Sequence, residues 1–182
     1  MSVLGSLTPL PAADHPELLA EPVVKALSRL PDATGVMVAE IDPELADTAA
    51  FCEAYSSPPE YSANCVVVSG RRSGEVRYAA CLVLATTRAD VNGVVKRRLD
   101  VRKASFAPMD EAVSLTGMEY GGITPLGLPA DWPVLIDAAV VAAGPVVVGS
   151  GLRRSKLVLD GASLPTLPMA QVVDGMAMPV PA

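Results

Sequence analysis

The spacing of apolar residues predicts strands and short helices that alternate along the whole chain. Two valine-rich runs, at 65–69 and 145–149, are continuously apolar, as is typical of buried strands. The run A-N-C-V-V-V-S, the turn G-R-R-S-G and the run E-V-R-Y-A-A-C-L-V-L-A together predict a β-hairpin. Further strands are expected at 35–41, 102–106, 133–137 and 156–160.

Helix signals fall between these strands. Acidic residues and prolines at 14–17 and at 42–43 indicate helix starts, and the second helix is expected to run to about Tyr55. Other helices are expected over 23–30, over 89–99 and from Pro108 to near Gly117. The pattern predicts one mixed α/β domain whose largely antiparallel central sheet is flanked by helices. Within it we expect an N-terminal helical and strand part at 1–60, a core at 61–175 and a flexible tail at 176–182.

A glycine-rich loop separates two of the predicted elements. The segment T-G-M-E-Y-G-G-I-T-P-L-G-L, from Thr116 to Leu128, holds four glycines and one proline in 13 residues. Gly121 and Gly122 permit positive φ and lack side-chain bulk, so backbone N–H groups can approach a ligand closely. Pro125 fixes its own φ and stiffens the end of the loop. The segment therefore predicts a pre-formed backbone pocket.

Composition narrows the class of protein. The 182 residues are 51% hydrophobic but only 4% aromatic, so the core is expected to consist of aliphatic side chains. No apolar run reaches the roughly 18–20 residues of a membrane span, and the N-terminus lacks the basic region of a signal peptide. The three cysteines, without C-x-x-C spacing, argue against a disulfide framework or a zinc cluster. Cys65 and Cys81 could lie near each other in the hairpin, but buried thiols in a cytoplasmic protein are the favoured interpretation.

The chain has a single histidine, His15, which is expected to be a surface or capping residue. Its isolation argues against a Ser-His-Asp or Cys-His mechanism and against a multi-histidine metal site. Neither a G-x-G-x-x-G after a strand nor a G-x-x-x-x-G-K-[ST] is present, which argues against a nucleotide cofactor. No metal or cofactor is therefore expected, and any chemistry has to use backbone donors, a few polar side chains and the substrate.

Charge is unevenly distributed along this acidic chain. The net charge is −6, yet residues 1–70 carry −8, whereas residues 71–156, with 12 basic and 8 acidic groups, carry +4. Such a positive region can steer a polyanion, although solvated helix and turn faces would give the same pattern. The basic residues cluster at Arg71, Arg72 and Arg77, at Lys96, Arg97, Arg98, Arg102 and Lys103, and at Arg153, Arg154 and Lys156.

From Ala63 to Leu164 the sequence resembles the YbaK/EbsC family of prolyl-tRNA synthetase-associated editing domains. The hairpin, the run R-K-A-S-F-A-P-M-D-E-A-V-S-L-T-G, the loop G-G-I-T-P-L-G and the closing runs V-V-V-G-S-G and K-L-V-L-D-G-A-S-L carry the resemblance, in that order. It implies metal-independent hydrolysis, in trans, of the ester that joins a wrong amino acid to the 3′ end of a tRNA. The implied partner is the aminoacyl-tRNA acceptor end, with an aminoacyl-tRNA synthetase as a further candidate.

The resemblance also implies the site residues. Loop amides would orient the substrate carbonyl and a water, and the terminal ribose hydroxyl of the tRNA would assist. Backbone donors aimed at a developing oxyanion can lower the barrier without a general base. The implied loop is Gly121, Gly122, Ile123, Thr124 and Pro125, and the implied second backbone wall is Gly149, Ser150 and Gly151. Asp137 would hold the loop or the substrate amine, or cap a helix, and Thr116 would be a pocket hydroxyl or a polar helix end.

One position departs from the family pattern. Many members place a lysine on the first hairpin strand, in a K-[ST]-L pattern that faces the pocket, and here Asn64 takes that place. An amide can donate a hydrogen bond but cannot replace an ammonium. This branch therefore edits without the lysine, has changed its substrate, or is an inactive tRNA- or synthetase-binding module. Lys103 and Lys156 are candidate substitutes for the charge, but we expect both at the surface.

Overall fold

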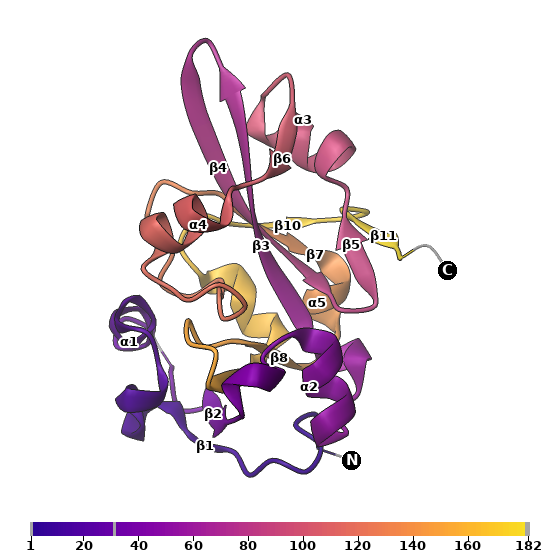
Figure 1. The fold of residues 1–182 in the computed structure, drawn as a ribbon. Coiled ribbons are helices and arrows are strands. Elements are labelled where there is room, and N and C mark those ends of the chain that lie inside the picture. Colours follow the sequence, from indigo (N-terminus) through magenta and orange to yellow (C-terminus); the bar gives the residue numbers. More distant parts are fainter. Residues whose placement is uncertain (1, 31, 181–182) are drawn as a thin grey trace.

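Two β-sheets form the body of the molecule (Figure 1). The computed structural model describes residues 2–30 and 32–180. The larger sheet has the strand order β10-β7-β4-β3-β6, the smaller has the order β1-β2-β9-β8, and β11 pairs with β5. The strands are β1 Leu10–Pro11, β2 Met37–Glu40, β3 Ala63–Arg72, β4 Glu75–Leu84, β5 Thr87–Ala89, β6 Ala104–Phe106, β7 Val134–Asp137, β8 Pro145–Gly149, β9 Ser155–Asp160, β10 Ala170–Val173 and β11 Ala177–Pro179.

The β3–β4 hairpin provides the two longest strands of the larger sheet, and its turn extends beyond the other strands at the top of Figure 1. Its antiparallel register runs from Ala63 opposite Leu84 to Arg72 opposite Glu75. β6 adds to β3 in the antiparallel sense, whereas β7 and β10 continue from β4 in the parallel sense. An isolated bridge between Ser62 and Val147 joins the start of β3 to β8 of the smaller sheet. The predicted mixed α/β class is confirmed.

The hairpin register separates two cysteines. Cys65 lies opposite Leu82, and Cys81 lies opposite Val66, the next residue along β3. Neighbouring residues of a strand project to opposite faces, so the two thiols lie on different faces of the sheet. All three cysteines are free, and burial raises the pKa of Cys81 to about 12 and that of Cys65 still further. The interpretation as a buried thiol therefore holds for Cys81, whereas Cys65 is only partly buried.

Within the described ranges, five short α-helices surround the sheets, and two of the predicted helices are divided. Asp42 accepts a hydrogen bond from the Glu44 N–H at 2.9 Å and starts a 3₁₀ turn, Pro43–Leu45, before the α-helix itself begins. Asp90 likewise caps a π-helical turn, Val91–Val95, with both carboxylate oxygens. The α-helices are α1 Glu21–Leu27, α2 Thr48–Tyr55, α3 Lys96–Leu99, α4 Met109–Thr116 and α5 Ala138–Ala142. None of the helices within the described residues is long and apolar enough to cross a bilayer.

Aliphatic side chains fill the space between and around the sheets. The largest buried cluster joins α1 and β2 to β7, β8 and β9. A second cluster packs the other face of the hairpin against 91–101 and against Met176, which is fully buried. The sequence predicts a flexible tail from residue 176, whereas 177–179 pair with β5; residues 181 and 182 of that range lie outside the described part.

Candidate active site

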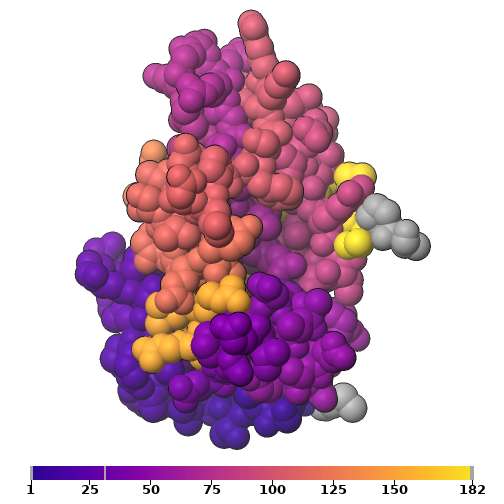
Figure 2. All heavy atoms as spheres, viewed as in Figure 1, coloured from indigo at the N-terminus to yellow at the C-terminus, as the bar shows by residue number. Residues whose placement is uncertain are grey.

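A cavity of about 350 Å³ opens where the two sheets meet. The start of β3, the end of β8, the N-terminal end of α2 and the glycine-rich loop surround it. In Figure 2 the coral segment with α4 and this loop lies beside the purple segment with α2. The lining residues that matter below are Ala46, Asp47, Thr48, Phe51, Asn64, Tyr120, Gly121, Ile123, Gly149 and Lys156.

The glycine loop is held against β8 by contacts that leave no room for side chains. Gly121 has φ +87°, and a Cβ on it would lie 2.5 Å from Nη1 of Arg153. A Cβ on Gly149 would lie 2.2 Å from the carbonyl oxygen of Gly122 and 2.7 Å from that of Ile123. The N–H of Gly151 donates to the same Gly122 oxygen at 2.7 Å. Backbone atoms thus require glycine at Gly149 and also at Gly122, where a Cβ would lie 2.7 Å from the carbonyl of Leu152, whereas at Gly121 the neighbouring atom belongs to a flexible side chain.

Some N–H groups of the loop make no hydrogen bond within the protein. The N–H of Gly122 donates to the carbonyl of Glu119 at 2.9 Å and is occupied. Among the described residues, the N–H groups of Tyr120, Gly121 and Ile123 have no such bond, and all three residues line the cavity. Tyr120 and Gly121 are exposed and Ile123 is half-buried, so an oxygen atom of a ligand in the cavity can reach this part of the loop.

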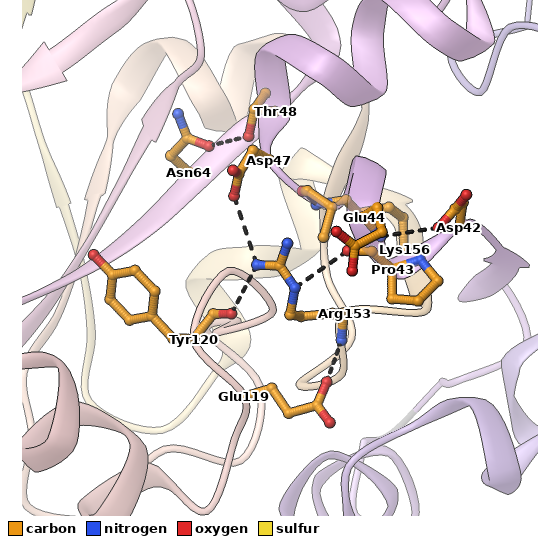
Figure 3. A network of polar contacts seen from close by, with 11 residues as sticks. Asp42, Pro43, Glu44, Asp47, Thr48, Asn64, Glu119, Tyr120, Arg153 and Lys156 are labelled. Carbon is orange, nitrogen blue, oxygen red and sulfur yellow. Dashed lines mark hydrogen bonds and ion pairs between the residues drawn. The ribbon is translucent and has the colours of Figure 1, made fainter.

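Arg153 ties the loop to the opposite side of the cavity mouth (Figure 3). Its Nη1 donates to the Tyr120 carbonyl at 3.2 Å and lies 3.7 Å from the Asp47 carboxylate. Its Nε donates to the carbonyl of Pro43 at 3.2 Å. Its own backbone N–H donates to the Glu119 carboxylate at 2.6 Å. One guanidinium therefore fixes the distance between the glycine loop and the start of α2.

Two further polar side chains converge on the segment 46–48. Asn64 on β3 accepts a hydrogen bond from the Thr48 hydroxyl at 2.5 Å, and Lys156 on β9 donates to the Ala46 carbonyl at 2.6 Å. The expected surface position of Lys156 is wrong: its residue is only 6% exposed and lines the cavity. Burial is the main cause that lowers the pKa of Lys156, to about 8. Lys103 is exposed, as expected.

Several of the predicted site residues support the loop without lining the cavity. The buried Thr116 hydroxyl donates to the Ala112 carbonyl at 2.7 Å and accepts from the Met118 N–H, as a polar helix end does. The buried Ser150 hydroxyl bonds to the Ser155 hydroxyl at 2.7 Å. Thr124 is buried, and its hydroxyl has no partner among the described residues. Gly122, Thr124, Pro125, Ser150 and Gly151 thus shape the wall behind the loop.

Asp137 is placed as the cap of a helix and not in the cavity. One carboxylate oxygen accepts from the Ala139 N–H at 2.9 Å at the start of α5, and the other accepts from the Ala177 N–H at 2.8 Å. Both oxygens therefore accept hydrogen bonds from backbone N–H groups. Of the two roles expected for Asp137, it has that of a helix cap.

The three large side chains around the loop have different surroundings. Met118 is buried in the main core cluster, whereas Tyr120 is 55% exposed and lines the cavity. Trp132 is buried and stacks on Tyr78, with ring centroids 5.0 Å apart. Of Met118 and Tyr120, only Tyr120 is placed to contact a ligand in the cavity.

Arg153, the segment 46–48 and the buried position of Lys156 were not expected from the sequence. A signal for Lys156 was present: it opens the run K-L-V-L-D, and a lysine in an otherwise buried strand is rare unless it has a role. Nothing local marks Arg153, because its partners are 33 to 110 residues away in the sequence. Within the part of the chain that is described, no group of three His, Cys, Asp or Glu residues is arranged to hold a metal ion.

The comparisons with known proteins agree with this fold. A family model for the aminoacyl-tRNA editing domain matches residues 42–167, which is more than half of the chain. The protein therefore belongs to the aminoacyl-tRNA editing domain family, as the resemblance to YbaK/EbsC predicted. No curated protein matches the sequence.

Solved structures share the architecture at low sequence identity. A putative trans-editing enzyme for prolyl-tRNA synthetase is 23% identical, with a TM-score of 0.71 over 85% of this chain and 94% of that one. A protein from a study of epitope grafting onto scaffolds is 22% identical, with a TM-score of 0.71 over 85% of this chain and 95% of that one. A hypothetical protein is 18% identical, with a TM-score of 0.69 over 85% of this chain and 96% of that one. At this identity the likeness establishes the fold.

Proposed function

We propose that this protein is an aminoacyl-tRNA deacylase that hydrolyses, in trans, the ester of a mischarged tRNA. Family membership supports a deacylase role in general. The observation that carries the proposal is the pair of unoccupied N–H groups of Gly121 and Ile123 on the cavity wall. Two such donors would bind the ester carbonyl oxygen and stabilise the charge that develops on it. The attacking water would be oriented by the same loop with help from the ribose hydroxyl of the tRNA.

The cavity has room for the aminoacyl end of a tRNA and not for its stem. About 350 Å³ is at the low end of the volumes of small-ligand sites. Ala46, Ile123, Val147 and the thiol-bearing Cys65 contribute small or aliphatic lining. A hydrophobic pocket of this kind selects between amino acids by fit, at about 1–3 kcal/mol per methylene.

A basic surface at the turn end of the β3–β4 hairpin suits the phosphates of the same substrate. Residues 71–103 carry nine basic and three acidic groups in a chain whose net charge is −6. The guanidinium of Arg77 donates to the Leu99 carbonyl at 3.0 Å, which joins the hairpin to α3. The hairpin end and α3 project together above the loop and α2 in Figure 2. We call this surface, at Arg71, Arg72, Lys96, Arg97, Arg98, Arg102 and Lys103, the basic tip.

The distance between the basic tip and the cavity fits a nucleic acid whose end enters the cavity. Asn64 lines the cavity and Arg71 stands seven residues along the same strand, about 24 Å at about 3.4 Å per residue. A short single-stranded 3′ end can span that distance while a duplex stem contacts the tip. Binding through phosphates would weaken steeply with salt.

The test is deacylation of a panel of purified aminoacyl-tRNAs, charged with Ala, Ser, Thr, Cys or Pro on cognate and noncognate tRNAs, with EDTA present. Turnover of one or two members would support the proposal and identify the substrate. Absence of turnover across the panel, at protein concentrations that bind tRNA, would contradict it.

A catalytically inactive module that binds tRNA or a synthetase is the second candidate. One observation favours it: Asn64 stands where many family members have a lysine, and its carbonyl oxygen is engaged by Thr48. Tight binding of the acceptor stem without deacylation of any panel member would support this candidate.

A further inference from the structure

Lys156 is a buried ammonium without a carboxylate partner. It is the second residue of β9, and its residue is 6% exposed. Its Nζ donates to the Ala46 carbonyl at 2.6 Å and lies 5.4 Å from the centroid of the Phe51 ring. None of the ion pairs among the described residues includes it. An ammonium has three N–H donors, so two remain beyond the one that Ala46 accepts.

Keeping such a group in place costs stability. Taking an ammonium out of water is unfavourable unless a partner charge compensates for it. The pKa of Lys156 is accordingly lowered to about 8, mainly by burial; Asp47 and Cys52 act in the opposite direction, and Arg153 makes a smaller contribution in the same direction as burial. A methionine or leucine would fill the same volume without this penalty. The presence of a lysine here therefore points to a role in the cavity that it lines.

Sheet register places Lys156 on the same side as the glycine loop. Lys156 is paired directly with Gly149 of β8. Directly paired residues project to the same face of a sheet. The Cβ direction of Gly149 points at the carbonyls of Gly122 and Ile123, because a Cβ there would lie 2.2 Å and 2.7 Å from them. The Lys156 side chain therefore extends on the face that the loop covers, and it lines the same cavity as Gly121 and Ile123.

We propose that the Lys156 ammonium donates a hydrogen bond to the carbonyl oxygen of the bound ester, together with the N–H groups of the loop. This inference rests on the proposed deacylase function. In the reaction, the oxygen of water bonds to the carbonyl carbon and the π electron pair moves onto the carbonyl oxygen. The C–O bond to the ribose then breaks, and the ribose oxygen leaves with the electron pair and takes up the proton that the water gives. Lys156 stays protonated throughout and stabilises the oxyanion between the two steps.

The positive charge in the cavity thus comes from Lys156 on β9. Asn64 occupies the position on β3 at which many family members have a lysine. Asn64 is hydrogen-bonded to Thr48, and Lys156 is hydrogen-bonded to Ala46, two residues earlier in the same segment. A cation from β9 therefore ends within the same region of the cavity as a side chain from that β3 position. This arrangement makes activity compatible with the asparagine.

The experiment compares wild-type protein with Lys156→Met, Lys156→Arg and the matched control Lys103→Met, in which an exposed lysine is changed. We expect Lys156→Met to lower kcat by at least about 100-fold, the reduction typical of removing one oxyanion donor, with KM little changed and the unfolding midpoint in urea unchanged or raised. Lys103→Met should keep wild-type kcat. A Lys156→Met protein that is folded and has wild-type kcat would overturn the inference.

A pH profile keeps the inference testable if Lys156→Met does not fold. Wild-type kcat, corrected for the enzyme-free rate, should fall above about pH 8 as Lys156 loses its proton. In Lys156→Arg the guanidinium stays charged, so any remaining activity should lack this fall. Titration of the substrate amine is common to both proteins and cancels in the comparison. Identical profiles, or a wild-type kcat that is constant from pH 7 to 9.5, would overturn the inference.

A binding measurement separates failure of this inference from failure of the proposed function. If wild-type protein deacylates no panel member, the proposed function fails, and binding of 3′-(alanylamino)-3′-deoxyadenosine, a non-hydrolysable amide, is measured instead. Wild-type binding that weakens at least tenfold in Lys156→Met would uphold the contact with the carbonyl oxygen. No binding, or equal binding by both proteins, would overturn that contact as well.

Discussion

Asn64 and Lys156 come from different sheets and are held by the same short segment of backbone. Thr48 donates to the Asn64 carbonyl oxygen at 2.5 Å, and Lys156 donates to the Ala46 carbonyl at 2.6 Å. Between these two contacts, Asp47 forms an ion pair with Arg153 at 3.7 Å. The segment at the start of α2 thus contacts Asn64, Lys156 and Arg153. Substitutions in the glycine loop, of the cationic side chains and in the basic tip should have separate effects on turnover, stability and tRNA binding.

Replacing Gly121 with alanine should remove deacylation while it leaves the fold largely intact. Gly121 has φ +87°, and a new methyl group would lie 2.5 Å from the flexible end of Arg153, which can move. Positive φ in alanine costs about 1 kcal/mol of unfolding free energy. The measurement is turnover beside a urea denaturation curve. Unchanged turnover in a folded Gly121→Ala protein would contradict the assignment of the loop as the oxyanion site.

Replacing Arg153 with methionine should lower kcat by roughly 10- to 100-fold, since small displacements of a positioned group have effects of this size. The substitution removes the interactions with Pro43, Asp47 and Tyr120 that fix the loop to α2. The control is Arg154→Met, which removes a neighbouring guanidinium that donates to the Glu17 carbonyl instead. Equal kcat in the two variants would show that the clamp on the loop is dispensable.

Thr124→Val should raise the free energy of unfolding by about 1 kcal/mol, because a buried hydroxyl without a partner is costly. Its turnover should stay near that of the wild type, since the proposed role of the loop is carried by backbone donors. Thermal denaturation and kcat are measured together. A large drop in kcat with intact stability would instead assign the hydroxyl a role in the reaction.

Reversing charge on the basic tip should weaken tRNA binding and reduce its salt dependence. Arg97 and Arg98 are both exposed on α3. In the double variant Arg97→Glu, Arg98→Glu, the slope of log affinity against log salt should fall by about 1 for each phosphate that the protein no longer neutralises. The exposed Arg29, outside the tip, provides the control Arg29→Glu. Equal slopes in the double variant and the control would place the RNA on another surface.

Lys156 should make a contribution to the stability of the protein that rises with pH above about 8. Its folded pKa of about 8 lies below the ordinary lysine value of 10.5. Between these values the unfolded chain binds more protons, so the free energy of unfolding increases with pH. In Lys156→Met this contribution is absent. Urea midpoints at pH 7.5 and pH 9.5 for both proteins test the prediction, and a parallel change in the two would contradict it.

The sequence alone determined most of the element order and the position of the loop. Continuous valine runs are typical of buried strands. The G-R-R-S-G turn after the first run identifies it as the first strand of the β3–β4 hairpin. Of the two glycines expected to permit positive φ, Gly121 adopts it, at +87°, and Gly122 does not. These inferences succeed because they depend on interactions between residues close in the chain.

Tertiary structure alone decided which side chains surround the cavity. Asp137 has the sequence context of both a ligand-binding residue and a helix cap, and only the approach of Ala177, 40 residues later, engages its second oxygen. Lys156 is a charged residue that sequence statistics assign to the surface, yet its pairing with Gly149 and the packing of α2 over it bury its ammonium. Arg153 meets Pro43 across 110 residues. Such interactions depend on how separate sheets pack, which local pattern and composition do not encode.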